Sequence, residues 1–173
     1  RSLQAGSFFS EKYTGEKIPT LEEVFETVGK RAFINVELTN YDTPRDHLVE
    51  TVCMLAKRFG LQKRVLFSSF FASNLSRARS YLPDVSIGLL ALGGFLGAWP
   101  RSFGFAFGRY DALHPNIKDA THQQVQRVHR LGRRIHVWTV NAEDDMRRMF
   151  NWNVDAIFTD DPQLAVKVRG EKA

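Results

Sequence analysis

The chain has 173 residues, of which 43% are hydrophobic and 25% charged, close to the average of globular domains. This composition excludes a disordered or fibrous protein and predicts a single domain over residues 1–173. The formal net charge is +5, but Lys and Arg are interspersed with acidic residues and form no long run, so we expect no nucleic-acid partner.

The sequence shows no membrane or disulfide signature. It has no stretch of about 18 apolar residues, and its N-terminus has no apolar segment after a basic start, so we expect neither a transmembrane segment nor a signal peptide. We expect a cytoplasmic location, and a periplasmic or secreted parent protein stays open because the first residue is Arg1 rather than Met. The single Cys53 lies in an apolar helical pattern, which is typical of a buried thiol.

Short β-rich runs alternate with helical patterns along the chain. Such alternation is typical of parallel βαβ units and predicts an α/β fold. Strands are expected at residues 33–38, 65–70, 86–90, 112–116, 134–140 and 156–160.

Capping residues mark the ends of the first two predicted helices. Thr20 and Glu23 have the spacing of a capping box, and the first helix should close at Gly29. The second helix is expected to have Thr43 as its N-cap, with Pro44 at its first position and Gly60 just past its end.

The later helices are predicted in the same way. Two of them should span residues 72–81 and 121–131. A third should begin after Asn141 as its N-cap, and the last should begin at Asp161-Pro162. Between them lies the connection GGFLGAWPRSFGFAFGRYD (93–111), which has several glycines and aromatic residues and which we interpret as an elaborated βα loop.

Two α/β architectures compete. A doubly wound sheet that binds a dinucleotide needs a Gly-rich turn after its first strand, and neither G-x-G-x-x-G nor G-x-x-x-x-G-K-[ST] occurs. A closed (β/α)8 barrel of the TIM type has eight strands and typically about 250 residues, so the chain is expected to form an incomplete barrel with about six βα units. Barrel strands end in active-site residues, and several predicted strands end in polar ones: Glu37, Ser68, Ser69, His114, Asn116, Thr139, Asn141 and Asp160.

Glu37 is the most unusual of these residues. Side chains alternate across a strand, so Glu37 shares a face with Asn35 and Thr39, opposite the apolar face of the same strand. A carboxylate inside a barrel is costly unless it is protonated, paired with a cation or bound to a metal. Glu37 is therefore a candidate metal ligand, with a salt bridge to Arg or Lys as the alternative.

Six pieces of the sequence follow one another along the chain: IPTLEEVFE (18–26), INVEL (34–38), SSF (68–70), HP (114–115), VWTVN (137–141) and FTDDP (158–162). In this order they resemble the glycerophosphodiester phosphodiesterase family. LQAGSFF (3–9) is similar to the segment that precedes the first piece in that family, and the resemblance extends to about residue 165. It implies a barrel enzyme that hydrolyses a small glycerophosphodiester to an alcohol and glycerol 3-phosphate, with one divalent cation, Mg²⁺ or Ca²⁺.

The resemblance also implies roles for two residues. Glu37 matches a third-strand Glu that holds the cation together with a Glu and an Asp of the second strand, and Trp138 matches a residue that lines the substrate pocket. Ser69 is a candidate hydrogen-bond donor to phosphate, and His114 is expected near the barrel mouth, although turn and cap roles are common for such residues.

The sequence departs from the family pattern at its catalytic positions. The family's catalytic histidines lie in HRG and HD motifs on the first two barrel strands, and neither motif occurs here; Thr39 stands where the family usually has Lys. We therefore expect the chain to match the family from before its third strand onward and to be inactive alone. Its exposed barrel edges predict self-association.

Other functions stay open at this point. The aromatic connection 93–111 could serve a non-catalytic binding or assembly module. A barrel like that of the phosphatidylinositol phospholipases would share the metal and histidine chemistry but should not contain both IPTLEEV and WTVN. A nucleotide-binding open sheet is the remaining alternative.

Overall fold

The structure is a computed structural model that describes residues 5–171; residues 3 and 4 of the LQAGSFF segment lie outside the described range. The described chain forms one parallel sheet whose strands are hydrogen-bonded in chain order. The strands are β1 (Ile34–Glu37), β2 (Val65–Ser69), β3 (Ser86–Ala91), β4 (Ala112–Pro115), β5 (Arg134–Val137) and β6 (Ala156–Ile157).

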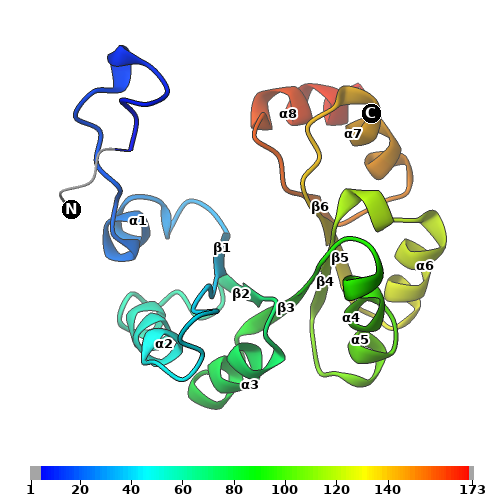
Figure 1. The fold of residues 1–173 in the computed structure, drawn as a ribbon, viewed down its shortest axis with the longest axis horizontal. Helices are drawn as coiled ribbons and strands as arrows, with labels where there is room; N and C mark the ends of the chain where they lie inside the picture. Colours follow the sequence, from blue (N-terminus) through cyan, green and yellow to red (C-terminus); the bar gives the residue numbers. More distant parts are fainter. Residues whose placement is uncertain (1–4, 172–173) are drawn as a thin grey trace.

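Figure 1 shows the strands in an open arc with the α-helices on its outer side, which is the arrangement of an incomplete barrel. The strictly sequential strand order has no point at which it reverses, as a doubly wound sheet would have, and this excludes the open-sheet alternative. The α-helices are α1 (Leu21–Val28), α2 (Leu48–Arg58), α3 (Ala72–Tyr81), α4 (Ala98–Arg101), α5 (Phe103–Phe107), α6 (His122–Arg130), α7 (Glu143–Asn151) and α8 (Pro162–Gly170); short 3-10 turns are η1 (Glu11–Tyr13), η2 (Phe95–Gly97) and η3 (Ile117–Asp119).

The hydrophobic core lies between the outer face of the sheet and these helices. Strands that are covered by helices need apolar residues on the covered face, because water is excluded there. The core residues from the strands include Phe67, Leu89, Leu113 and Ile135, and those from the helices include Cys53, Leu75, Val125 and Met146.

Most predicted helix ends are confirmed. The Thr20 amide donates to the Glu23 carboxylate (2.7 Å), and the Glu23 amide donates to the Thr20 hydroxyl (3.3 Å), which completes the capping box. Thr121 and Asp161 each cap a helix through the side chain, and Gly60 and Gly132 follow helix ends with positive φ, where glycine has no steric penalty.

The predicted start of the second helix was wrong. α2 begins at Leu48 rather than after Thr43, because the preceding residues form a separate hydrogen-bonded turn around the Asp46 carboxylate. That carboxylate accepts hydrogen bonds from Asn40 Nδ2 (2.7 Å), from the Thr43 hydroxyl (2.8 Å) and from the Leu48 amide (3.0 Å).

The prediction that Asn141 caps α7 was also wrong, since the N-cap is Ala142. The Asn141 side chain accepts from the Asp160 amide (3.0 Å) and donates to the Asp160 carboxylate (2.7 Å), so it joins the segments that follow β5 and β6. The two strands end before those segments, at Val137 and Ile157, and are shorter than the predicted spans 134–140 and 156–160.

None of the described helices is both long and apolar enough to cross a membrane.

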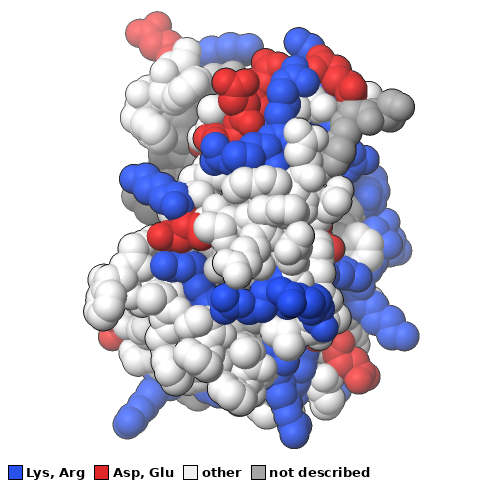
Figure 2. Space-filling model, turned by 90° about the vertical axis from the view of Figure 1, so that its right-hand side faces the viewer, with Lys and Arg blue, Asp and Glu red and all other residues white. Residues whose placement is uncertain are grey.

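On the face drawn in Figure 2, basic and acidic side chains occur together near one end, and uncharged surface separates further basic side chains below them. The absence of a nucleic-acid partner stays a prediction.

Candidate active site

Glu37 is the last residue of β1 and points to the inner, concave side of the arc. Its register partner is Ser68, and the adjacent Asn35 Nδ2 donates to the Ser68 hydroxyl (3.0 Å). Register partners in a parallel sheet have side chains on the same face. His114 pairs with Leu90 and Trp138 pairs with Asn116, and this register places the side chains of His114 and Trp138 on the inner face as well.

Glu37 is exposed rather than enclosed, which corrects the expectation of a buried carboxylate. The reason is that β1 is an edge strand of the described sheet, so nothing on its far side covers the residue. The Tyr41 hydroxyl donates a 2.9 Å hydrogen bond to Glu37 Oε1. This neutral donor differs from the salt bridge to Arg or Lys that was expected as the alternative to metal binding. Burial and the Glu37 carboxylate raise the pKa of Tyr41, so the phenol stays protonated and keeps donating.

Aromatic rings connect Glu37 to the opposite side of the arc. The ring of Tyr41 packs edge-on against Phe71 (centroids 4.9 Å apart) and Phe70 (5.9 Å), and Phe70 in turn packs edge-on against Trp138 (5.8 Å). The series Tyr41, Phe70 and Trp138, called the aromatic bridge here, spans the carboxyl ends of β1, β2 and β5. Sequence reasoning missed Tyr41; Phe70 lies within the SSF piece, but no role was assigned to it.

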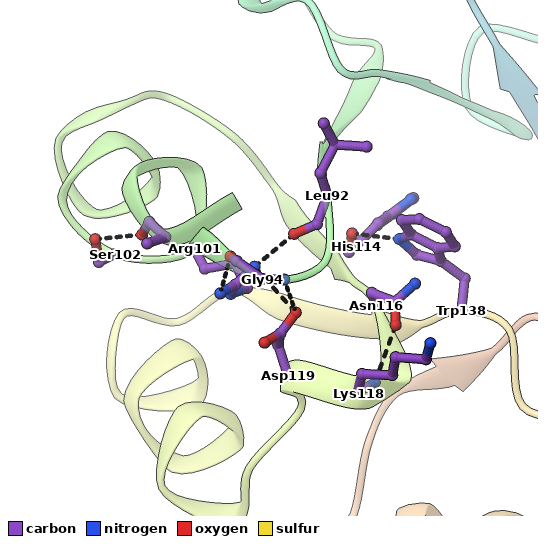
Figure 3. Close-up of polar contacts among 10 residues, drawn as sticks. Leu92, Gly94, Arg101, Ser102, His114, Asn116, Lys118, Asp119 and Trp138 are labelled. Atoms are coloured by element: carbon purple, nitrogen blue, oxygen red, sulfur yellow. Dashed lines mark hydrogen bonds and ion pairs between the residues drawn. The ribbon is translucent and has the colours of Figure 1, made fainter. Parts of the chain in front are cut away.

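Trp138 is held in place by the backbone of β4. Its indole Nε1 donates a 2.7 Å hydrogen bond to the carbonyl oxygen of His114, and its own backbone bonds with Pro115 and Ile117. The peptide bond between Trp138 and Thr139 is cis. Figure 3 shows the indole beside His114 and Asn116 at this end of the sheet.

His114, which was expected near the barrel mouth, is fully buried. Its Nε2 lies 3.0 Å from His136 Nδ1, and a Cβ atom on Gly88 would come within 2.5 Å of this nitrogen. The absence of a side chain at Gly88 thus gives the imidazole its space on the inner face. Burial, with a smaller contribution from His136, lowers the pKa of His114 to about 3, so this histidine is neutral at neutral pH.

Ser69 lies on the opposite face of β2 from the other candidates. Its hydroxyl is buried, donates to the Leu38 carbonyl oxygen (2.9 Å) and accepts from the Phe71 amide (3.2 Å). Asn74 Nδ2 contacts the same hydroxyl (3.3 Å) and donates to Asn40 Oδ1 (2.6 Å). Ser69 therefore joins the end of β1 to α3, and the structure does not bring it together with Glu37 and Trp138.

The loops after β3 and β4 are tied to each other beside Trp138 (Figure 3). The Asp119 carboxylate accepts from the Gly94 amide (2.7 Å) and forms an ion pair with Arg101 (3.2 Å), and Arg101 also donates to the Gly94 carbonyl oxygen (2.9 Å). The Asn116 side chain accepts from the Lys118 amide (3.0 Å) and caps η3. Asn116, one of the polar residues expected at the strand ends, thus caps the turn that follows β4.

The donor set on this face fits one ligand of a cation, not a complete shell. Within residues 5–171, no three His, Cys, Asp or Glu side chains gather in a group that could hold a metal ion. Mg²⁺ takes about six oxygen ligands and Ca²⁺ six to eight, and the exposed carboxylate of Glu37 is a suitable hard ligand. Within the described residues, Glu37 is therefore not part of a complete set of His, Cys, Asp or Glu ligands.

Comparison with known proteins gives a consistent family. A sequence model of the glycerophosphoryl diester phosphodiesterase family matches residues 1–164. A glycerophosphodiester phosphodiesterase of Caldanaerobacter subterraneus is 33% identical over 171 residues, covering 97% of this chain and 68% of the relative. One from Bacillus subtilis is 28% identical, with 98% and 62% covered.

Solved structures show the same similarity. An Oleispira antarctica phosphodiesterase, solved in complex with its product sn-glycerol-3-phosphate, aligns with a TM-score of 0.82 and 26% identity over 96% of this chain and 67% of that protein. A glycerophosphodiester phosphodiesterase of Parabacteroides distasonis aligns with a TM-score of 0.75 and 25% identity over 91% and 66%. The chain thus spans about two thirds of the length of the proteins that it matches.

Proposed function

Because the chain belongs to the glycerophosphoryl diester phosphodiesterase family, we propose that it is part of an enzyme that hydrolyses small glycerophosphodiesters to an alcohol and glycerol 3-phosphate. The observation that best supports this function is the position of Glu37 on the inner face, at the carboxyl end of β1, where barrel enzymes have their active sites. The glycerol 3-phosphate bound to the Oleispira relative supports the proposed product.

We propose that Glu37 is one oxygen ligand of a divalent cation, Mg²⁺ or Ca²⁺. Such an ion, when bound, would polarise a phosphoryl oxygen and neutralise the charge that develops on it. Tyr41 holds the carboxylate through Oε1, and the packing of its ring against Phe71 fixes the direction of this hydrogen bond. Tyr41 is thus a positioning residue for Glu37.

Trp138 is the proposed apolar wall for the glycerol carbons. The hydrogen bond from its indole to the His114 carbonyl oxygen fixes the orientation of the ring, so His114 contributes through its backbone rather than through its buried imidazole. Ser69 holds the carbonyl oxygen of Leu38, the residue after Glu37, and therefore supports the metal ligand from the opposite face. In this proposal His114 and Ser69 act through their neighbours.

The chain alone should not catalyse the reaction. General acid–base catalysis needs a group that gains and loses a proton near the working pH, and burial lowers the pKa values of both inner-face histidines, His114 and His136. The family's HRG and HD motifs are absent from the sequence. We therefore propose that the acid, the base and the remaining metal ligands are supplied by polypeptide other than these 173 residues.

A hydrolysis assay tests this proposal. The chain alone, incubated with glycerophosphocholine and Mg²⁺ or Ca²⁺, should release no glycerol 3-phosphate above the background without protein. Release that a chelator abolishes would contradict the proposed inactivity.

A non-catalytic binding module is the second candidate, favoured by the exposed aromatic residues of the connection 93–111. Calorimetric titration with Mg²⁺ and Ca²⁺ separates the two functions. Weak cation binding that Glu37→Gln removes and Glu50→Gln leaves unchanged supports the enzyme, whereas binding unaffected by Glu37→Gln favours the module.

A further inference from the structure

A group of large apolar side chains is exposed on the β3–β4 connection. The exposed fractions are 93% for Phe95, 78% for Leu96, 68% for Trp99, 60% for Phe103 and 83% for Phe107. We call these five residues the aromatic surface. Single exposed apolar residues are ordinary, but five within thirteen positions of η2, α4 and α5 form a patch that a soluble protein seldom leaves without a partner.

The rest of the segment is firmly anchored, so the exposure is a property of its folded conformation. Phe105 is buried and stacks with Tyr110 (6.1 Å), and Arg133 lies over the Phe105 ring (4.9 Å). On the outer side, the ring of Phe103 lies 6.2 Å from both Trp99 and Phe107. One side of the segment thus packs on the core while the other presents a continuous row of rings to solvent.

The aromatic surface also lies far from the open edges of the barrel. Its segment connects β3 to β4, in the middle of the sheet, whereas the edge strands of the described sheet are β1 and β6. The connection therefore does not border the strand edges at which further barrel units would pair.

The charges around the aromatic surface are basic. The sequence from Leu92 to Arg109 contains no Asp or Glu, and its charged residues are two arginines. The acidic residues that follow are already paired, Asp119 with Arg101 and Asp111 with Arg79. Asp119 neutralises Arg101, so the exposed Arg109, two residues after Phe107 in the sequence, gives this segment a net positive charge that attracts anions.

We propose that the aromatic surface docks the protein onto an anionic lipid bilayer. Trp and Phe side chains partition into the interface between head groups and acyl chains, and adjacent arginines are attracted to anionic head groups. A second copy of the chain is a poorer partner, because a two-fold contact would bring the same basic residues together. The first residue of the surface, Phe95, directly follows the Gly94–Asp119 contact at the carboxyl end of the sheet (Figure 3), so docking would bring the candidate active site near the lipid.

Vesicle co-sedimentation tests the proposal with matched variants. The test variant is Phe95→Ser/Phe107→Ser, and the control is Phe8→Ser/Phe9→Ser, which removes two rings that are 85% and 77% exposed in another part of the molecule. Arg109→Ser, with the exposed Arg45→Ser as its control, tests the electrostatic part. Urea unfolding of each variant verifies that all four retain the stability of the wild-type protein, since the substituted side chains are exposed.

The wild-type protein should bind vesicles of phosphatidylcholine with phosphatidylglycerol more strongly than vesicles of phosphatidylcholine alone. Phe95→Ser/Phe107→Ser should weaken binding by about tenfold or more, Arg109→Ser should reduce the preference for anionic vesicles, and both controls should bind like wild type. Equal binding of wild type and test variant would overturn the proposal. So would sedimentation velocity showing a lipid-free dimer that Phe95→Ser/Phe107→Ser dissociates, because a second copy would then cover the surface.

Discussion

The Tyr41 hydroxyl donates to Oε1 of Glu37 across 2.9 Å, and this contact holds the carboxylate that we propose as a cation ligand. Tyr41 is four residues beyond Glu37, in the loop after β1, and its ring begins the aromatic bridge to Trp138. A proposed metal ligand and a proposed substrate wall are thereby part of one packed unit.

The pKa of Tyr41 should report on the charge at Glu37. The carboxylate disfavours the phenolate, so Glu37→Gln should lower the pKa of Tyr41, and Mg²⁺ bound at Glu37 should lower it in the wild-type protein only. Ring resonances of Tyr41, followed by NMR during an alkaline titration, measure this pKa. Asp42→Asn is the control for a nearby loss of charge. If Glu37→Gln leaves the pKa of Tyr41 unchanged, the contact between the two side chains is disproved.

The buried histidine pair predicts acid sensitivity. Burial places the pKa of His114 at about 3, below its ordinary value of 6.5, so the unfolded chain takes up a proton that the folded protein resists. The free energy of unfolding is therefore unaffected by this group above pH 6.5 and decreases as the pH falls from 6.5 towards 3. Between neutral pH and about pH 5 the decrease should be about 2 kcal/mol.

Urea unfolding at a series of pH values measures that loss. His114→Gln should lower the stability at neutral pH but flatten its decline between pH 6.5 and about pH 5, because one of the two buried imidazoles is gone. An unchanged slope in this variant would mean that other groups cause the acid sensitivity.

Gly88 should tolerate no side chain. A Cβ atom there would lie 2.5 Å from His114 Nε2 and 2.7 Å from its Cε1, and the buried ring has little room to move. We expect Gly88→Ala to reduce the free energy of unfolding by about 1–3 kcal/mol. Gly170→Ala is the matched control, since no atom lies within 4 Å of its added Cβ and alanine favours the helix; equal stability of both variants would contradict the packing around His114.

Ser69 should affect stability through its buried hydrogen bonds. Ser69→Ala removes the donor to the Leu38 carbonyl oxygen and a contact of Asn74, so we expect a loss of about 1–3 kcal/mol in urea unfolding. The exposed Ser80→Ala should stay within about 0.5 kcal/mol of wild type. A fully stable Ser69→Ala protein would show that this serine does not hold the end of β1.

The sequence was sufficient to predict the parallel strands and most helix ends, because both depend on local patterns. Alternation along β1 placed Glu37 opposite the core, and side-chain caps such as Thr20 and Asp161 are encoded within four residues. The start of the second helix was predicted wrongly because two local hydrogen-bonding patterns compete in this segment. Thr43 and Pro44 fit an N-cap pattern, but Asp46 accepts three hydrogen bonds and closes the turn first.

The candidate site depended more on contacts between distant segments, which one sequence does not specify. Whether Ser68 or Ser69 lies on the same face as Glu37 depends on the register of β1 against β2, and this register pairs Glu37 with Ser68. The buried position of His114 depends on the missing side chain of Gly88, on a different strand. Exposure of Glu37 could not be inferred from alternation, because it depends on whether β1 has a neighbour.

The central claim is that Glu37 is a metal ligand of a phosphodiesterase whose remaining catalytic groups lie outside these 173 residues. The most direct test joins this chain to the part of the Caldanaerobacter relative that it does not match, and measures chelator-sensitive release of glycerol 3-phosphate from glycerophosphocholine. The joined protein should be active, and Glu37→Gln should lower its activity by about 100-fold or more, while Glu50→Gln should not. Full activity of the joined Glu37→Gln protein would contradict the account.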